Sequence, residues 1–145
     1  MPSVVQINPA QAFELLKNDS NSVLVDVRTF EEFKLVGVVN PDEFNNRMIL
    51  LPWQIMPQMG LNPEFNSDLE KEVKEIFGDK ALDAKLIFIC RSGARSNQAA
   101  SEVINLGYSN CYNLSYGFEG EPNQLGERGK LNGWKAESLP WRQKQ

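Results

Sequence analysis

Histidine is absent from this 145-residue chain. Its absence excludes the designs in which a histidine activates a catalytic serine or cysteine, and it removes the imidazole ligand that most zinc sites use. A nucleophilic cysteine in this chain would therefore have to be held as a thiolate by electrostatics alone.

Cysteine is scarce as well, and long apolar runs are missing. The two cysteines, Cys90 and Cys111, form no CxxC pair, so a reducing cytoplasm is the simplest location to expect. The apolar run at residues 48–51 is interrupted at once by Pro52, and no run approaches the length of a membrane span. Residues 1–6 show neither the charged nor the apolar region of a signal peptide.

The charge balance is acidic, with a formal net charge of −4. It argues against nucleic acid and against an anionic membrane surface as partners. Arg91 and Arg95 lie close to Cys90 in the sequence and form a local positive spot. That spot favours a small anion as ligand.

The length and the 41% hydrophobic content indicate one domain over residues 1–145 with a sizeable core. Apolar strand patterns alternate with helical patterns along the chain, and the strands are expected at residues 4–7, 23–27, 86–89 and 111–114. This alternation predicts right-handed βαβ units, and therefore an α/β fold with a mainly parallel sheet.

Two helix starts carry capping-box spacing. Asn8 is followed three residues later by Gln11, and Thr29 is followed three residues later by Glu32. In each pair, side chain and backbone of both residues are expected to bond reciprocally. The second box predicts a brief helix over residues 30–34.

Residues 36–65 carry weaker patterns. Short strands are expected at 36–39 and 48–51, followed by a long irregular connection over 52–63. Three large side chains of this connection are expected to cover the core: Trp53, Met56 and Met59.

Two later segments complete the expected organisation. A further helix is expected to have Asn66 or Ser67 as its N-terminal cap and to end at Gly78. The tail over residues 117–145 holds several large apolar residues and is expected to pack on the body.

The stretch from residue 86 to residue 107 reads as buried strand, tight turn and helix. Cys90 stands at the carboxyl end of the strand, where open α/β sheets place their ligands. Its loop leads into a helix N-terminus, where N–H groups and the helix dipole favour negative charge. A thiol there is expected to ionise easily, whereas Cys111 lies inside a strand and is expected to be an inert core residue.

Three motifs resemble the rhodanese (sulfurtransferase) family. Cys90-Arg91-Ser92-Gly93-Ala94-Arg95-Ser96 looks like the family's active-site loop, which begins with a persulfide-forming cysteine. Residues 24–28 with Glu32 are similar to its early "DVR…E" motif, and residues 132–134 with 139–140 to its closing "GW…LP" pattern. The chain thus resembles a single-domain rhodanese. The resemblance implies a three-layer fold in which a mainly parallel sheet of about five strands has helices on both faces.

The sequence also departs from the family pattern. Gly37-Val38-Val39 stands where the family usually has Gly-His-Ile, and residues 116–120 replace the usual paired glycines after the last strand. These regions help to shape the pocket mouth in the family. The motifs therefore assign no role to segments 36–65 and 117–131.

The implied activity is sulfur transfer from thiosulfate or a persulfide donor, through a persulfide on Cys90, to cyanide, a thiol or a protein sulfur acceptor. Neither a cofactor nor a metal is implied. Cys90 is the implied catalytic residue, and the implied substrate-binding residues are Arg91, Ser92, Gly93, Ala94, Arg95 and Ser96. Supporting roles fall to Asp26, Arg28 and Glu32.

The charged residues can also be interpreted as solvated or purely structural groups. Arg91 and Arg95 could be solvated loop charges, although guanidinium forks match oxyanions well. Arg28 and Glu32, four residues apart, are expected to form a structural ion pair rather than to take part in catalysis.

Two other functions are weighed against the enzyme. A cysteine phosphatase of the same fold would use a C-x5-R loop, whereas residues 90–95 here read C-x4-R, a cradle better sized for a sulfur atom. The second alternative is a persulfide carrier or a regulatory protein-binding module.

Overall fold

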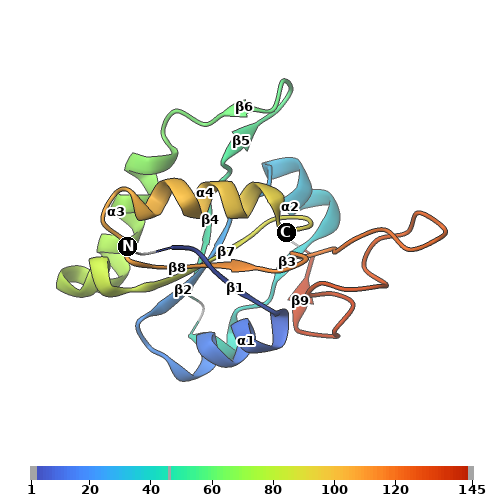
Figure 1. Ribbon diagram of the computed structural model, residues 1–145, viewed down its shortest axis with the longest axis horizontal. Helices are drawn as coiled ribbons and strands as arrows, with labels where there is room; N and C mark the ends of the chain where they lie inside the picture. Colours follow the sequence, from blue (N-terminus) through green and yellow to red (C-terminus); the bar gives the residue numbers. More distant parts are fainter. Residues whose placement is uncertain (1–2, 46, 144–145) are drawn as a thin grey trace.

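The computed structural model describes residues 3–45 and 47–143. Its centre is a five-stranded sheet in the order β1-β8-β7-β2-β4 (Figure 1), in which every neighbouring pair is parallel. The strands are β1 (Val5–Ile7), β2 (Ser22–Asp26), β4 (Met48–Leu50), β7 (Lys85–Ile89) and β8 (Asn110–Leu114). The predicted α/β fold with about five parallel strands is confirmed.

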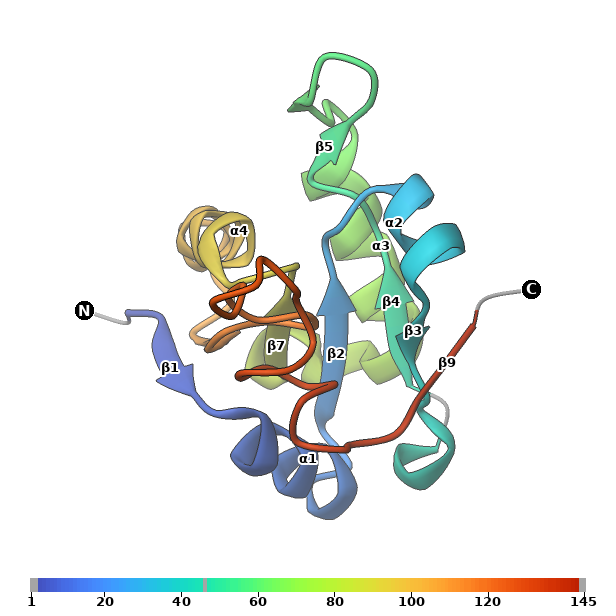
Figure 2. The same cartoon turned by 90° about the vertical axis from the view of Figure 1, so that its right-hand side faces the viewer.

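Within the described residues, four α-helices cover both faces of this sheet. They are α1 (Pro9–Asn18), α2 (Phe30–Val36), α3 (Phe65–Phe77) and α4 (Ala94–Ile104), and the short 3-10 helices η1 (Asp42–Phe44) and η2 (Gly78–Asp83) lie between them. Figure 2 shows α3 and α4 on one side of the sheet, and α1 with the C-terminal tail on the other.

The strand residues alternate between two apolar clusters, because successive side chains of a strand point to opposite faces. Val25 and Phe88 pack with α3 and α4. Leu24 and Ile87 pack with α1 and with Trp134 of the tail. The sheet is thus the middle layer of three.

Both capping boxes are present. The Asn8 side chain accepts from the Gln11 N–H at 2.8 Å while the Gln11 side chain accepts from the Asn8 N–H at 2.9 Å. Thr29 and Glu32 make the same reciprocal pair at the start of α2. Both helices begin where the sequence predicts.

Residues 36–65 are more ordered than expected. β3 (Val38–Val39) pairs antiparallel with β9 (Trp141–Arg142), and β5 (Gln54–Ile55) forms a small hairpin with β6 (Gly60–Leu61). The predicted irregular connection over 52–63 is therefore wrong in part.

Two further expectations in this region also need correction. Trp53 is buried as expected, whereas Met56 is exposed, because it lies in the hairpin that projects from the body. Helix α3 begins at Phe65 without a side-chain cap, so the predicted cap at Asn66 or Ser67 is wrong and both residues lie inside the helix.

The tail packs on the body through a few large side chains. Phe118 and Trp134 are fully buried, while Leu125 and Leu131 are exposed. The Trp134 N–H donates to the Gly117 carbonyl at 2.9 Å. Within the described part of the chain, no helix combines the length and apolar character needed to cross a bilayer.

Candidate active site

Cys90 follows β7, the central strand of the sheet, at its carboxyl end. The ends of the neighbouring strands meet there, and the Val27 N–H after β2 donates to the Ile89 carbonyl at 3.0 Å. Cys90 itself is 1% exposed. The thiol therefore sits at the floor of this edge and not on the surface.

Gly93 connects Cys90 to α4. Its φ of +111° lies in the left-handed region, which glycine adopts without strain. In this conformation its N–H donates to the Cys90 sulfur at 3.1 Å. Helix α4 begins directly afterwards without a side-chain cap, so its first N–H groups have no partner within the helix and favour an anion beside the sulfur.

A side-chain hydroxyl also reaches the sulfur. The Ser96 Oγ lies 3.2 Å from the Cys90 Sγ, 3.2 Å from the Gly93 carbonyl and 2.5 Å from the Asn113 Oδ1. Ser96 and Asn113 are both buried. Sequence analysis missed Asn113, although an amide between the apolar residues Tyr112 and Leu114 of a predicted strand is a signal that could have indicated it.

The remaining loop residues Arg91, Ser92 and Ala94 are not among the groups that hydrogen-bond to the Cys90 sulfur. Arg91 and Ala94 are exposed, and Ser92 is half-buried. Glu119 N and Gly120 N both donate to the Arg91 carbonyl at 3.0 Å. The structure thus ties the backbone of Arg91 to the tail and leaves its side chain toward solvent.

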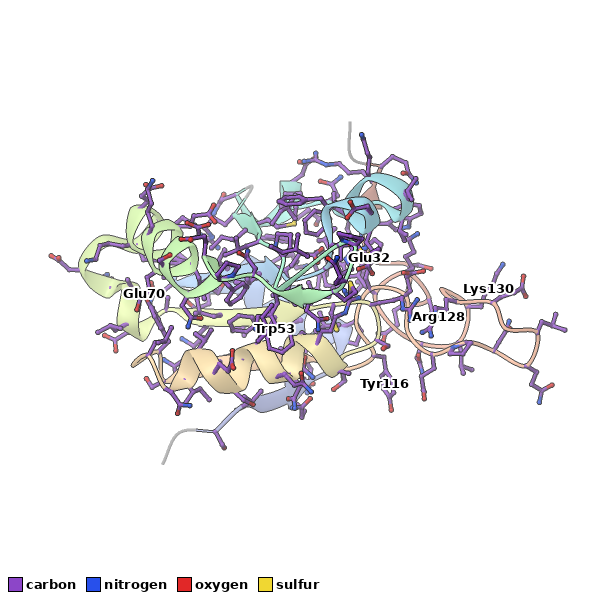
Figure 3. The ribbon with its side chains drawn as sticks, turned by 90° about the horizontal axis from the view of Figure 1, so that it is seen from above. Glu32, Trp53, Glu70, Tyr116, Arg128 and Lys130 are labelled. Carbon is purple, nitrogen blue, oxygen red and sulfur yellow. The ribbon has the colours of Figure 1, made fainter. Side chains whose placement is uncertain are left out.

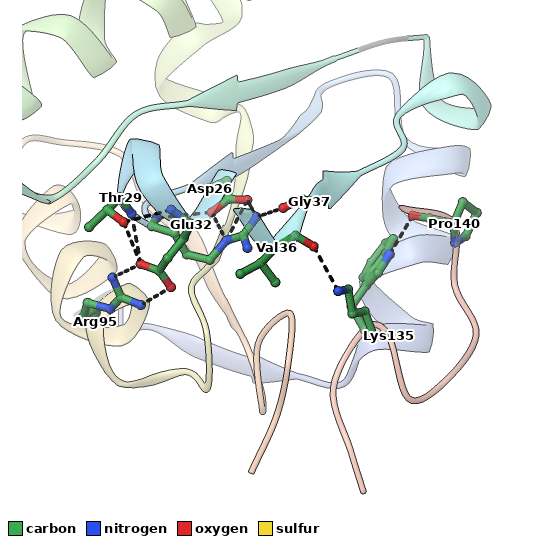
Figure 4. Close-up of polar contacts among 10 residues, drawn as sticks. Asp26, Thr29, Glu32, Val36, Gly37, Arg95, Lys135 and Pro140 are labelled. Atoms are coloured by element: carbon green, nitrogen blue, oxygen red, sulfur yellow. Dashed lines mark hydrogen bonds and ion pairs between the residues drawn. The ribbon is translucent and has the colours of Figure 1, made fainter. Parts of the chain in front are cut away.

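Arg95 is held by Glu32 across a separation of 63 residues. Its Nη1 and Nη2 donate to the two carboxylate oxygens of Glu32 at 2.8 and 2.9 Å (Figure 4). Burial alone would lower the pKa of Arg95, but the bond and charge of Glu32, followed by the charges of Cys90 and Asp26, raise it above its usual value. Arg95 is therefore a fixed cation near the sulfur.

Arg28 pairs with Asp26 and not with Glu32, so the predicted Arg28–Glu32 pair is wrong. Arg28 precedes α2, which begins at Phe30, and helical i,i+4 spacing does not apply to it. Its Nε and Nη2 bond the Asp26 carboxylate at 2.7–3.2 Å, and Nη2 also donates to the Gly37 carbonyl at 2.8 Å (Figure 4). Both side chains are fully buried.

The Phe118 ring lies 4.2 Å from the Arg28 guanidinium carbon, which places this buried pair beneath the tail. The tail also braces the Cys90 loop, since the Phe118 N–H donates to the Cys90 carbonyl at 2.8 Å. Gly117 precedes it with a φ of +62°, and a Cβ there would lie 2.7 Å from the Arg91 carbonyl oxygen.

Tyr116 directly precedes Gly117 and lies beside the start of α4 (Figure 3). Its φ of +69° is unusual for a bulky residue, and its side chain is 46% exposed. The loop that carries Arg128 and Lys130 projects from the body at the same end (Figure 3).

A family model described as the rhodanese-like domain matches residues 9–120, which include Cys90 and its loop. The chain belongs to the rhodanese-like domain family. The predicted family resemblance is confirmed.

Several proteins resemble this rhodanese-like chain over nearly its whole length. An uncharacterized protein of Rickettsia rickettsii is 40% identical over 139 residues, covering 96% of this chain and 98% of its own. A rhodanese-like domain-containing protein of Arabidopsis thaliana is 33% identical, covering 81% of this chain and 67% of its own.

Solved structures agree with the fold. The crystal structure of Rv0390 from M. tuberculosis has a TM-score of 0.83 and 34% identity, covering 98% of this chain and 99% of that one. A polysulfide-sulfur transferase from Wolinella succinogenes has a TM-score of 0.59 and 20% identity, covering 96% and 78%. The latter likeness shows the fold alone.

Cys111, the second thiol of this rhodanese-like domain, has a different environment. It is 1% exposed inside β8, and burial raises the pKa of its thiol to about 12. Its sulfur lies 3.4 Å from the Tyr108 carbonyl. These features suit a protonated core residue.

Proposed function

We propose that the protein is a sulfurtransferase that carries sulfane sulfur on Cys90. In the first step the Cys90 thiolate attacks the outer sulfur of thiosulfate or of a persulfide donor. The new Sγ–S bond forms as the donor S–S bond breaks, and sulfite or a thiolate leaves with the electron pair. A persulfide anion remains on Cys90.

The second step discharges this persulfide. An acceptor nucleophile, such as cyanide or a thiolate, bonds to the outer sulfur, and the electron pair of the Sγ–S bond returns to the Cys90 sulfur. Sulfur transfer is thus a double displacement. Neither step with thiosulfate and cyanide moves a proton, so a chain without histidine can carry out both.

The observation that carries the proposal is the sulfur's set of donors. The Gly93 N–H and the Ser96 hydroxyl lie within 3.1–3.2 Å of the Cys90 Sγ, at the start of a helix whose first N–H groups are uncapped by a side chain. The backbone N–H groups are fixed in place and stabilise a developing negative charge without reorganising, and the Ser96 hydroxyl can turn its proton toward the sulfur.

Arg91 and Arg95 are proposed to attract the anionic donor. The exposed Arg91 side chain can meet the donor directly. Arg95 acts through its charge, because Glu32 occupies both ends of its guanidinium fork.

Asp26 and Arg28 support the site by fixing the buried end of β2, and no cofactor is assigned to the reaction. Two free cysteines support a reducing compartment such as the cytoplasm.

The test is mass spectrometry of the protein after incubation with thiosulfate. One added sulfur atom on the Cys90 peptide, removed again by cyanide, is the expected result. Cys90→Ala should lose the adduct and the thiocyanate product, while Cys111→Ala is the matched control and should keep both. Sulfur transfer by Cys90→Ala, or no adduct on the native protein, would overturn the proposal.

The same preparation separates the alternatives. An adduct that passes only to a protein acceptor and never to cyanide would indicate a carrier. A phosphatase would hydrolyse p-nitrophenyl phosphate, which we expect the native protein not to do, because the C-x4-R loop is one residue shorter than a phosphatase cradle.

A further inference from the structure

A chain of side-chain hydrogen bonds runs from the edge strand β1 to the catalytic sulfur. The Gln6 Nε2 donates to the Asn97 Oδ1 at 2.7 Å, and the Gln6 Oε1 accepts from the Asn113 Nδ2 at 2.8 Å. The Asn113 Oδ1 lies 2.5 Å from the Ser96 Oγ, which in turn lies 3.2 Å from the Cys90 Sγ. This series of hydrogen bonds therefore ends on the proposed reacting atom, the Cys90 Sγ.

The orientation of the Asn113 amide is fixed by its neighbours. Its Nδ2 donates both to Gln6 and to the Gly93 carbonyl, the latter at 3.2 Å. Both of these partners are acceptors, so the nitrogen must face them and the oxygen must face Ser96. The short Ser96–Asn113 contact is thus a bond in which the Ser96 hydroxyl donates.

A hydroxyl has a single proton to donate, and Ser96 has three acceptors within 3.2 Å. While the proton points at Asn113, the Ser96 oxygen presents lone pairs to Cys90. That arrangement suits a thiol, whose S–H donates, or an inner persulfide sulfur, which carries little charge. A thiolate requires the opposite arrangement, with the hydroxyl proton turned toward the sulfur.

We propose that Asn113 is a positioning residue for the sulfur transfer proposed above: it holds the Ser96 proton away from Cys90 until the sulfur becomes a thiolate. During discharge, the acceptor bonds to the outer sulfur and the Sγ–S electron pair returns to Cys90. The Ser96 O–H then turns from the Asn113 Oδ1 to the Sγ. Its proton stays on the Ser96 oxygen throughout, so the charges of the transfer reaction are unchanged.

Changing the acceptor strength at position 113 should move the ionisation of Cys90 in a defined direction. Asn113→Leu removes the nearest competitor of the sulfur and leaves the Gly93 carbonyl as the other acceptor, so the Ser96 proton becomes more available to the thiolate, which favours ionisation. Asn113→Asp strengthens the competitor and adds a negative charge, which opposes it. The charged groups around the loop are the same in both variants, and they are Arg91 of the loop itself, Arg95 of α4, Glu32 of α2, and the Asp26–Arg28 pair at the end of β2.

The experiment measures the rate of Cys90 alkylation by iodoacetamide against pH in the native protein and in both variants. Alkylation needs no sulfur transfer, so this readout stands even if the thiosulfate adduct is never found. The pH midpoint is expected to fall by roughly 0.5–1 unit in Asn113→Leu, as one freed hydrogen bond implies, and to rise in Asn113→Asp. Shifts of the same sign in both variants, or no shift, would overturn the proposal.

The Ser96→Ala background separates positioning from a purely structural effect. Without the hydroxyl, the shift caused by Asn113→Leu should disappear, because it acts through Ser96. A shift of unchanged size in that background would refute the role of Asn113.

Gln6 offers a second test of the proposal, because its side chain is exposed on the edge strand β1 and its replacement leaves the core intact. Gln6→Ala lets the Asn113 amide turn, and the midpoint should fall as in Asn113→Leu but by less. Gln6→Glu keeps an acceptor for Asn113 and adds a negative charge, so the midpoint should not fall below the native value. These two variants decide the question if the Asn113 variants do not fold, and equal midpoints for both would refute the proposal.

Discussion

Replacing Gly117 by alanine should disturb the Cys90 loop more than the position of Gly117 in the tail suggests. The new Cβ would meet the backbone of both Cys90 and Arg91, 2.7 Å from the Arg91 carbonyl oxygen. Backbone atoms cannot rotate away as a side chain can. The loop and the tail must therefore separate to admit the methyl group.

The expected cost has two parts. A non-glycine residue in the left-handed region costs about 1–2 kcal/mol. Separation also weakens three hydrogen bonds, from Phe118 N to the Cys90 carbonyl and from Glu119 N and Gly120 N to the Arg91 carbonyl. At about 1 kcal/mol each, these add about 2–4 kcal/mol to the loss of unfolding free energy.

Gly126→Ala is the matched control. Gly126 also has a positive φ, of +80°, but nothing lies within 4 Å of its added Cβ. It therefore reports the backbone conformational cost alone. Urea unfolding of the two variants, with the proposed sulfur transfer measured on the folded protein, isolates the part due to the contact between the tail and the Cys90 loop. Equal unfolding midpoints and equal transfer rates in the two variants would show that the tail does not brace the loop.

Three other predictions follow from charge and burial. Burial alone would raise the pKa of Glu32, but its hydrogen bonds to Arg95 and to the Thr29 N–H, together with the Arg95 charge, lower this pKa below its usual value. As the pH falls, the unfolded chain therefore takes up the Glu32 proton before the folded protein does. The Glu32–Arg95 pair stabilises the fold above about pH 4.5, and that contribution is lost as the pH falls further. Glu32→Gln should accordingly cost about 1–3 kcal/mol at neutral pH and flatten the acid limb of the stability curve, measured by urea unfolding from about pH 6 to pH 3. Cys111, whose thiol pKa is raised to about 12, should be alkylated far more slowly than Cys90 at neutral pH, and peptide mapping that finds equal labelling would contradict this. Arg91→Ala should reduce the rate with thiosulfate more than the rate with a neutral persulfide donor, whereas equal losses in steady-state assays would reassign Arg91 to structure.

Sequence reasoning succeeded where the determining contacts are local. The capping boxes at Asn8 and Thr29 each involve residues three positions apart, so spacing alone identifies them. The strand-loop-helix unit around Cys90 is likewise continuous in the chain, and the order of its elements was predictable from apolar periodicity.

The partners of charged and polar side chains were less predictable, because folding brings these side chains together from distant parts of the sequence. Arg95 finds Glu32 at a separation of 63 residues, and Asn113 finds Gln6 at a separation of 107. Arg28 takes a neighbour two residues away instead of the helical partner that its spacing suggested. The β3–β9 pair joins residues near 39 and 141, and no local pattern announces such a pairing.

The bond between the tail and the Cys90 loop also sets an order of events during synthesis. Cys90 and α4 are made before Gly117, and the Trp134 N–H that holds the Gly117 carbonyl is made later still. A nascent chain that stops before Trp134 therefore has a cysteine loop whose brace is itself unanchored. The fully braced Cys90 loop therefore requires Trp134, which lies 44 residues after Cys90 in the chain.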